Sequence, residues 1–195
     1  MALTIVTEPT VEPLSLEEIE DHLRLSETST GAEDAVLLFF LTAARRYCER
    51  VQGRAYLEQV WRLTLDDFPR AEYIELPRSP LVGVSALVYY GTGGTAHTMT
   101  AANYYVDTES EPGRVHLQYG ESWPSETLRP ANGVAVTYTA GYGSVPTAVP
   151  SEVKQAIKLL IGHMYERRES SDIKEVYRMP DGAEALLSLD RIWPV

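Results

Sequence analysis

Few residues of this sequence have the types and spacing that enzymatic chemistry requires. Residues 91–95 (GTGGT) are rich in glycine, but no Gly-Lys-Ser/Thr follows as in a phosphate-binding loop, so we interpret them as a hairpin turn. Residues 141–143 (GYG) lack the third glycine of a dinucleotide-binding turn, and residues 83–85 (GVS) lack the closing glycine of a nucleophile elbow. We therefore predict no catalytic residue and no bound cofactor.

The histidines and carboxylates also lack the spacing of a known type of site. No histidine is paired at short spacing with a second His or Cys, as metal sites require. His163 and Glu166 lie on one predicted helix, but a di-metal carboxylate bundle repeats such a pair on other helices. Asp66 and Asp67 are expected in a turn, whereas acid–base catalysis needs two carboxylates in contrasting environments. We predict no metal site, and a hydrolase that uses one of these pairs is the enzymatic alternative.

The composition favours a globular protein that does not bind nucleic acid in bulk. The 195 residues carry a formal net charge of −11, whereas nonspecific DNA binding depends on Lys and Arg that neutralise phosphates. Residues 1–34 contain nine Asp and Glu against the single Arg24. Such a surface suits a protein past which DNA must slide without adhering. The single cysteine, Cys48, cannot form an internal disulfide and is compatible with a reducing cytoplasm.

No segment of the sequence has the pattern of a signal peptide or a membrane span. The N-terminus, MALTIVTEPT, has no basic region followed by an apolar one. The longest apolar run, residues 35–41, is far shorter than the roughly 20 residues that cross a bilayer. We therefore expect a soluble protein that does not associate with membranes.

A long helix predicted over residues 31–54 is the element on which the rest of the chain must be organised. Its first half, residues 35–41, is apolar on nearly every side, and a helix of this kind is covered on all sides. Either the rest of the chain or a neighbouring subunit must supply that cover. In the second half we assign the charged residues to a solvated face: Arg45, Arg46, Glu49 and Arg50. Gly53 is the expected C-terminal cap.

Two further helices are predicted on either side of this element in the chain. Ser15 and Glu18 have the spacing of a capping box, which predicts a short helix that ends near Leu25. After Pro150, apolar residues at spacings of three and four predict a helix that ends near Arg168. The apolar stripe of this last helix should pack on the central helix.

The middle of the sequence changes to the alternating pattern of β-strands. About six strands are predicted, over residues 58–67, 73–76, 82–90, 104–107, 114–117 and 134–140. The predicted fold class is α+β, with a helical core, an inserted small antiparallel β region and an extended C-terminal tail. The predicted parts are the N-terminal arm and helices (1–56), the β region (57–145), the C-terminal helix (146–169) and a flexible segment with a tail (170–195).

Tyrosines are concentrated in the predicted β region. The sequence contains twelve tyrosines against three phenylalanines. Many of them lie in the β region, among them Tyr89, Tyr90, Tyr104, Tyr105, Tyr119, Tyr138 and Tyr142. They are typical of sheet packing or of a protein interface. Stacking on single-stranded nucleic acid also uses tyrosine, but it requires a basic groove that is missing here.

Several motifs occur in the order found in a known family. They are LSLEE at 14–18, HLRL at 22–25, AARRY at 43–47, GRA at 53–55, QVWRLTLDDFP at 59–69, PRSPL at 77–81, YTAGY at 138–142, VP at 149–150, KQAI at 154–157 and EALL at 184–187 with Arg191. Together they resemble the head–tail connector (adaptor) family of tailed bacteriophages, which also occurs in gene-transfer-agent particles. The best-known members are mostly helical, so the fold of residues 57–143 depends on the strand pattern alone.

The resemblance implies a structural protein without catalysis. Twelve copies would form a ring beneath the portal, extend the DNA channel toward the tail and provide the surface to which the tail attaches. The implied partners are further copies of the chain, the portal protein, a stopper or tail-terminator protein, and duplex DNA that passes without sequence-specific binding. The implied location is the head–tail interface of the virion, after synthesis in the bacterial cytoplasm.

Two groups of residues are candidates for these contacts. The apolar C-terminus is a candidate portal-docking tail, with Leu186, Leu187, Leu189, Arg191, Ile192 and Trp193. The candidate subunit interface consists of Leu37, Leu38, Phe39, Phe40, Tyr89 and Tyr90. Two alternatives are a stopper or tail-completion protein of the same particle, and a small soluble ligand-binding protein built on the tyrosine-rich region.

Overall fold

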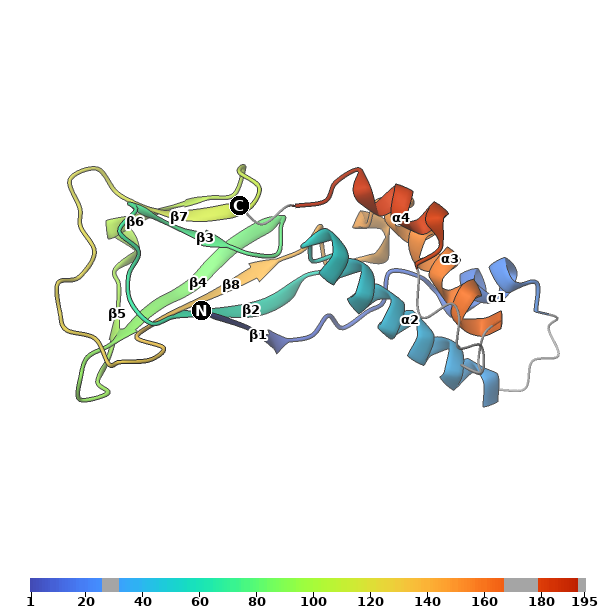
Figure 1. Ribbon diagram of the computed structural model, residues 1–195, viewed down its shortest axis with the longest axis horizontal. Helices are drawn as coiled ribbons and strands as arrows, with labels where there is room; N and C mark the ends of the chain where they lie inside the picture. The colour runs from blue at the N-terminus through green and yellow to red at the C-terminus, as the bar shows by residue number, and fades with distance from the viewer. Residues whose placement is uncertain (26–31, 167–178, 193–195) are drawn as a thin grey trace. The chain divides into compact units, whose positions relative to one another are not determined.

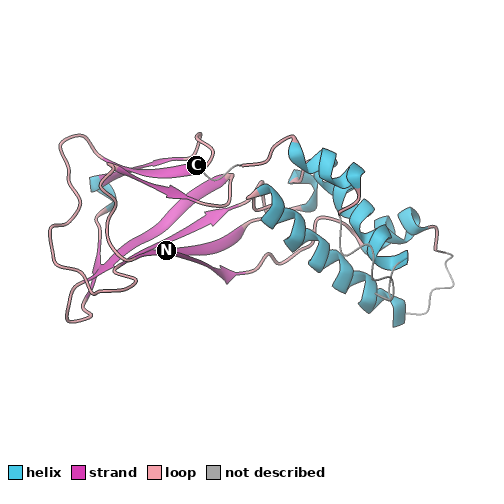
Figure 2. Cartoon of the chain, in the orientation of Figure 1, coloured by secondary structure: helices cyan, strands magenta, loops and turns pink. Residues whose placement is uncertain are grey.

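The computed structural model describes residues 1–25, 32–166 and 179–192, and the chain divides into two compact units (Figures 1 and 2). The β unit comprises Met1–Pro9 and Glu58–Tyr142, and the helical unit comprises Thr10–Leu57 and Gly143–Val195. The described ranges contain eight strands and four α-helices. The strands all belong to the β unit and the α-helices to the helical unit.

A five-stranded antiparallel sheet forms the larger layer of the β unit. Its strands, in spatial order, are β1 (Ala2–Thr7), β2 (Gln59–Leu65), β8 (Val134–Ala140), β4 (Leu81–Tyr90) and β5 (Ala96–Thr98). The register aligns Leu63 with Val136, and Val136 with Leu87. All three side chains are fully or almost fully buried, so this row belongs to the core of the unit.

A three-stranded antiparallel sheet forms the second layer. Its order is β3 (Tyr73–Leu76), β7 (Gly113–Leu117) and β6 (Tyr104–Asp107), and the short 3-10 helix η1 (Ala101–Asn103) precedes β6. Ile74, Leu76 and Val115 are buried on one face of this sheet. A Cβ at Gly113 would lie 2.5 Å from the Cβ of Leu81, which shows how closely β7 approaches β4. Only glycine permits this close approach of two strands.

The helical unit contains α1 (Leu16–Leu23), α2 (Ala32–Gln52), α3 (Ser151–Glu166) and α4 (Asp181–Ser188), with the 3-10 helix η2 (Pro146–Ala148) before α3. The predicted capping box is confirmed at the start of α1. The Ser15 N–H donates to Glu18 Oε2 (2.9 Å), and the Glu18 N–H donates to Ser15 Oγ (3.1 Å). The helix ends at Leu23, because Arg24 adopts a left-handed conformation.

The core of the helical unit lies between α2 and α3. A stripe on α2 is fully buried and consists of Leu37, Leu41, Ala44 and Cys48, which share one side of the helix. The predicted stripe on α3 supplies buried partners that include Val153, Ile157 and Ile161. Gly53 has a φ of +73° after α2, which confirms the expected cap. In the part of the chain that the structure describes, none of the helices is both long and apolar enough to cross a membrane.

The predicted fold class is wrong in three respects. The β region is not a small insertion in a helical core, because its seven described strands join β1 in two sheets with their own core. Residues 2–7 pair with β2, with Ala2 opposite Thr64, so the expected entry arm is an edge strand of the larger sheet. The expected extended tail contains α4, whose Ala183 and Leu187 are buried. Residues 170–178 of the segment predicted to be flexible lie outside the described residues.

Candidate assembly surfaces

Arg45 occupies the centre of a buried polar cluster in the helical unit. Its side chain is 2% exposed, its Nε donates to Glu12 Oε2 (2.7 Å), and its guanidinium also donates to Glu49 Oε2 (3.1 Å). The Thr42 hydroxyl donates to the second oxygen of Glu12 (2.9 Å). The assignment of Arg45 and Glu49 to a solvated face is therefore wrong. Their charges are tolerated in the interior because they pair with each other and with Glu12.

The cluster extends from Glu49 to the C-terminal part of the chain. The Tyr56 N–H donates to Glu49 Oε1 (3.0 Å), and the Tyr56 hydroxyl donates to Gln52 Oε1 (2.7 Å). The Gln52 amide then donates to the carbonyl oxygen of Leu187 (2.9 Å). We call this connected set the polar network. Its members are Glu12, Thr42, Arg45, Glu49, Tyr56, Gln52 and the carbonyl of Leu187. It connects the segment before α1, the helix α2 and the end of α4.

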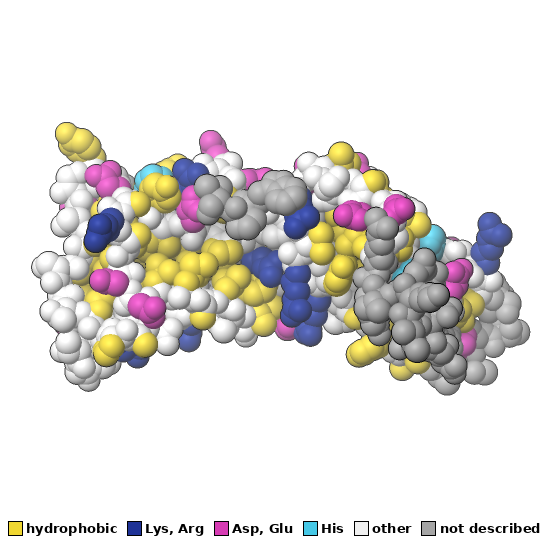
Figure 3. All heavy atoms as spheres, in the orientation of Figure 1, with side chains coloured by type: hydrophobic (Ala, Val, Ile, Leu, Met, Phe, Trp, Pro, Cys, Tyr) yellow, Lys and Arg dark blue, Asp and Glu magenta, His cyan; other side chains and the backbone are white. Residues whose placement is uncertain are grey.

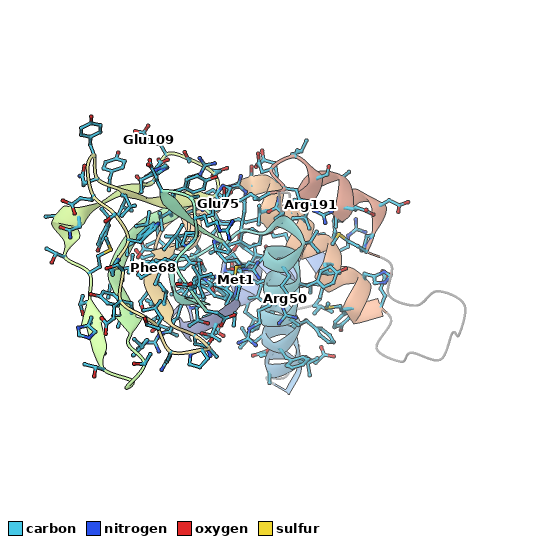
Figure 4. The ribbon with its side chains drawn as sticks, turned by 60° about the vertical axis from the view of Figure 1, so that its left-hand side comes forward. Met1, Arg50, Phe68, Glu75, Glu109 and Arg191 are labelled. Carbon is cyan, nitrogen blue, oxygen red and sulfur yellow. The ribbon has the colours of Figure 1, made fainter. Side chains whose placement is uncertain are left out.

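The residues after α4 are held against the C-terminal end of α2. The Ile192 N–H donates to the carbonyl oxygen of Gln52 (2.9 Å), and Arg54 Nε donates to the carbonyl oxygen of Asp190 (2.6 Å). Arg191, which lies between these two contacts in sequence, is near the same end of α2 in Figure 4. The last carbonyl groups of a helix have no hydrogen-bond donor within that helix. The Ile192 N–H supplies the donor for the carbonyl of Gln52.

The residues of the candidate docking tail differ in exposure. Leu187 is 1% exposed and belongs to the core of the helical unit, and Leu186 and Ile192 are half-buried. Leu189 is 69% exposed, and Arg191 is also exposed. Trp193 lies outside the described residues. Up to Ile192, Leu189 is therefore the tail residue with the most apolar surface available to a partner.

The candidate interface residues of α2 also separate into two groups. Leu37 is fully buried, and Phe40 is half-buried with its ring 6.2 Å from that of Phe39. Phe39 is 70% exposed and Leu38 is 46% exposed. Tyr47, which lies two turns further along α2, is 42% exposed. The surplus of apolar surface predicted from the sequence is thus present on one side of α2 and absent on the other.

The exposed side of α2 is hollowed. Its lining defines what we call the outer α2 face: Phe39, Thr42, Ala43, Arg46, Tyr47 and Arg50. The hollow has a volume of about 350 Å³. Arg50, at the C-terminal end of this face, is labelled in Figure 4. A face with an apolar centre, two exposed aromatic rings and arginines is typical of a protein interface.

The two candidate interface tyrosines of the β unit have partners within the unit. The ring of Tyr89 lies 5.9 Å from Phe68 and 5.3 Å from His97, and it stacks on the latter. The guanidinium of Arg129 lies 3.9 Å from the centre of the Tyr90 ring. Both tyrosines are half-buried. The packing of the sheet therefore accounts for much of their surface, and their part in a subunit interface stays a prediction.

The outer face of the three-stranded sheet carries two rows of polar and aromatic residues. The register aligns Tyr73, His116 and Tyr105 in one row and Glu75, Arg114 and Asp107 in the next. Acidic, basic and histidine side chains gather over this sheet in Figure 3. The Arg114 guanidinium lies 5.1 Å from the Tyr73 ring and 3.6 Å from Glu75. Hydrogen bonds from Ser110, with smaller help from the charge of Arg114, hold the pKa of Asp107 below its usual value.

Asp66 and Asp67, which were considered for catalysis, have structural partners. Asp66 accepts a hydrogen bond from the Asn132 N–H (3.0 Å), and Asp67 accepts one from the Phe68 N–H (2.8 Å). Burial, followed by the charge of Glu49, raises the pKa of the Cys48 thiol to about 12. Among the described residues, no three His, Cys, Asp or Glu side chains gather as metal ligands do.

Comparison with solved structures identifies the family. A chain in the neck of an empty gene-transfer-agent particle, computed with C6 symmetry, matches with a TM-score of 0.84 and 30% sequence identity. The match covers 100% of this chain and 97% of that one. The chain belongs to the head–tail connector-type proteins of gene-transfer-agent particles. The resemblance inferred from the order of short motifs is thereby confirmed.

Two further structures match this connector-type protein over its whole length. A chain in the virion of a native gene-transfer-agent particle has a TM-score of 0.81 and 29% identity. A chain in the neck of a native particle, computed with C12 symmetry, has a TM-score of 0.79 and 28% identity. Each match covers 100% of this chain and 97% of the other. No family model and no curated protein sequence matches the connector-type chain significantly.

Sequence reasoning missed the polar network and the two rows on the three-stranded sheet. The spacing of Arg45 and Glu49 by four residues was a signal for the first, because such residues meet on one side of a helix. Nothing local identified Glu12 as the third member. The rows depend on strand register, which the alternation within a single strand does not reveal.

Proposed function

We propose that this protein is a structural head–tail connector (adaptor) subunit. It forms a ring of twelve copies beneath the portal, continues the DNA channel toward the tail and offers the tail its attachment surface. The observation that carries this proposal is the match over the whole chain to neck chains, one computed with C6 and one with C12 symmetry. The role is noncatalytic and needs no cofactor.

The outer α2 face supports lateral assembly. Cyclic rings are built from contacts in which one patch of a subunit meets a different patch of the next. Phe39, at 70% exposure, and Tyr47, at 42%, leave aromatic surface in water on a helix whose opposite side is fully buried. Aromatic anchors of this kind carry much of the energy of protein association. The neighbouring copy in the ring covers this face.

The C-terminal segment supports attachment to the portal. Leu187 holds the segment in the helical unit, whereas Leu189 presents a largely exposed side chain and Arg191 a charge. The residues that follow, 193–195 (WPV), extend the same apolar character. The polar network and the bond from Ile192 to Gln52 hold this segment, up to Ile192, against the end of α2. Leu189 and the following residues are the portal contact.

The charge of the chain supports passage of DNA. With a net charge of −11, the protein repels the phosphate backbone on average, and the repulsion is strongest at low salt. The duplex therefore passes through the ring without sequence-specific binding. The stopper or tail-terminator protein binds the opposite end of the ring from the portal.

A test of the portal contact must spare the core of the helical unit. Deleting residues 184–195 removes the buried Leu187, so the informative changes are Leu189→Asp and deletion of residues 193–195. Each variant should remain folded and lose attachment to portal-containing heads in a sedimentation assay. Glu184→Ala, on an exposed position of α4, is the matched control and should attach normally.

Two outcomes would count against the proposal. Normal attachment of both variants would remove the C-terminal segment from the portal contact. If the wild-type protein binds purified tail components but not the portal, it is instead a stopper or tail-completion protein. Circular dichroism of each variant separates loss of attachment from loss of folding.

A further inference from the structure

We propose that the outer α2 face of one copy binds the acidic face of α1 in the neighbouring copy. This inference rests on the proposed ring, and it names the two surfaces that meet at each lateral contact. Both surfaces belong to the helical unit, and they carry opposite charges. The contact is therefore head-to-tail, as a closed ring requires.

The α2 side of this contact combines apolar and basic groups. Phe39 and Tyr47 supply exposed aromatic surface, and Arg46 and Arg50 are both exposed at the C-terminal end of the same face. The two arginines are four residues apart, so they lie about 6 Å apart along the helix axis, on the same side. A partner with two acidic groups at a similar spacing would oppose a carboxylate to each of these positive charges.

The α1 side carries two acidic groups with that spacing. Glu17 and Asp21 are exposed and four residues apart on the outer side of α1, opposite the buried Ile19. The capping box fixes the first turn of this helix, which lowers the entropy lost when Glu17 binds a partner. Val11, in the segment before α1, is 39% exposed and adds apolar surface to the same part of the chain.

Charge selects this pairing over the symmetric alternatives. Two outer α2 faces brought together would oppose arginine to arginine, and two α1 faces would oppose carboxylate to carboxylate. Like charges at an interface suppress such contacts, whereas opposite charges promote association and fix its register. A symmetric contact would also give closed dimers rather than rings. The α1–α2 pairing avoids like charges and propagates around a ring.

Charge reversal of each face tests the proposal. Particles are produced with Glu17→Arg/Asp21→Arg, with Arg46→Glu/Arg50→Glu, or with all four changes, and the amount of this protein per portal is measured by immunoblot. Each two-residue variant should be incorporated at least about tenfold less than wild type, because like charges then face each other. The four-residue variant should recover most of the loss, because the charges are again opposite.

The control variant is Glu121→Arg/Glu184→Arg, which makes the same charge change as the α1 variant at exposed positions outside both faces. It should be incorporated normally. Circular dichroism of each purified variant establishes that it is folded, and a folded Asp21→Cys/Arg50→Cys protein should give ladders of cross-linked copies within particles.

The results separate this inference from the proposed function. Absence of wild-type protein from the neck would overturn both. If wild-type protein is present, normal incorporation of the α1 variant would overturn the inference alone. The inference alone would also be overturned by a second pair of results: the folded four-residue variant is incorporated no better than the α2 variant, and no cross-linked ladder forms.

Discussion

Removing the guanidinium of Arg45 should strongly destabilise the helical unit. The side chain is 2% exposed and pairs with Glu12 and with Glu49, whose side chain is 6% exposed. Arg45→Ala leaves both carboxylates without their cation. A buried charge that loses its partner raises the free energy of the folded state, since it has neither water nor an opposite charge to stabilise it.

The structure allows an estimate of the loss. Removing one partner of a buried ion pair costs about 3–5 kcal/mol. The Glu12 side chain is 24% exposed and keeps some contact with water, so most of the cost comes from Glu49. We therefore expect the lower end, about 3 kcal/mol of unfolding free energy. For a chain of this length, that corresponds to a decrease in melting temperature on the order of 10 °C.

The matched control is Arg50→Ala, the same change at an exposed position of the same helix. It should change the free energy of unfolding by less than about 0.5 kcal/mol. Urea titrations followed by far-ultraviolet circular dichroism would measure both variants. Equal stability of the two variants would refute the argument from buried charge.

A third variant separates the effect of charge from the effect of packing. Replacing Glu12 and Glu49 by glutamine in the Arg45→Ala background removes the uncompensated charges but keeps the cavity left by the arginine. Part of the lost stability should return, because neutral amides are less costly to bury than carboxylates. If none returns, the loss arises from packing alone.

Two further predictions concern the interior of each unit. The Cys48 thiol is fully buried and has a pKa raised to about 12. A thiol reagent at neutral pH should therefore label it only when the helical unit opens. Similar labelling rates in native and urea-unfolded protein would contradict this prediction. In the β unit, Gly113→Ala places a Cβ 2.5 Å from Leu81, whereas a Cβ at Gly83 meets no atom within 4 Å. Urea titration should therefore show a loss of about 1–3 kcal/mol for Gly113→Ala beyond any change for Gly83→Ala, and equal losses would exclude overpacking as the cause.

Local features of the fold could be predicted because their causes lie within a few residues. The capping box of Ser15 and Glu18 needs only the turn that it caps, and Gly53 needs only the end of α2. The alternation that predicts β2 and β8 also depends on adjacent residues. These elements form where the sequence predicts them, with boundaries that differ by one or two residues.

The size of the β unit could not be predicted in this way. β1 pairs with a strand that begins only at Gln59, and the prolines after β1 favoured an extended arm over an edge strand. The close approach of Gly113 to Leu81 depends on the packing of one sheet on the other. Without these long-range contacts the sequence predicted a helical core with an insertion, and that prediction was wrong.

The sequence by itself indicated the family and predicted where contact surfaces would lie. The order of short motifs indicated a head–tail connector, and the surplus of apolar residues over residues 35–41 indicated an interface on the central helix. The tertiary structure decided which side of that helix is free. Leu37 is fully buried, whereas Phe39 is 70% exposed.

The same division applies to charge and to the C-terminus. Arg45 and Arg50 are the same residue type on one helix, yet only Arg45 is buried, because Glu12 reaches it from 33 residues earlier in the chain. Leu187 and Leu189 are two residues apart, yet only Leu189 remains exposed. Burial depends on which distant groups supply cover and hydrogen bonds, and a pattern within one segment does not contain that information.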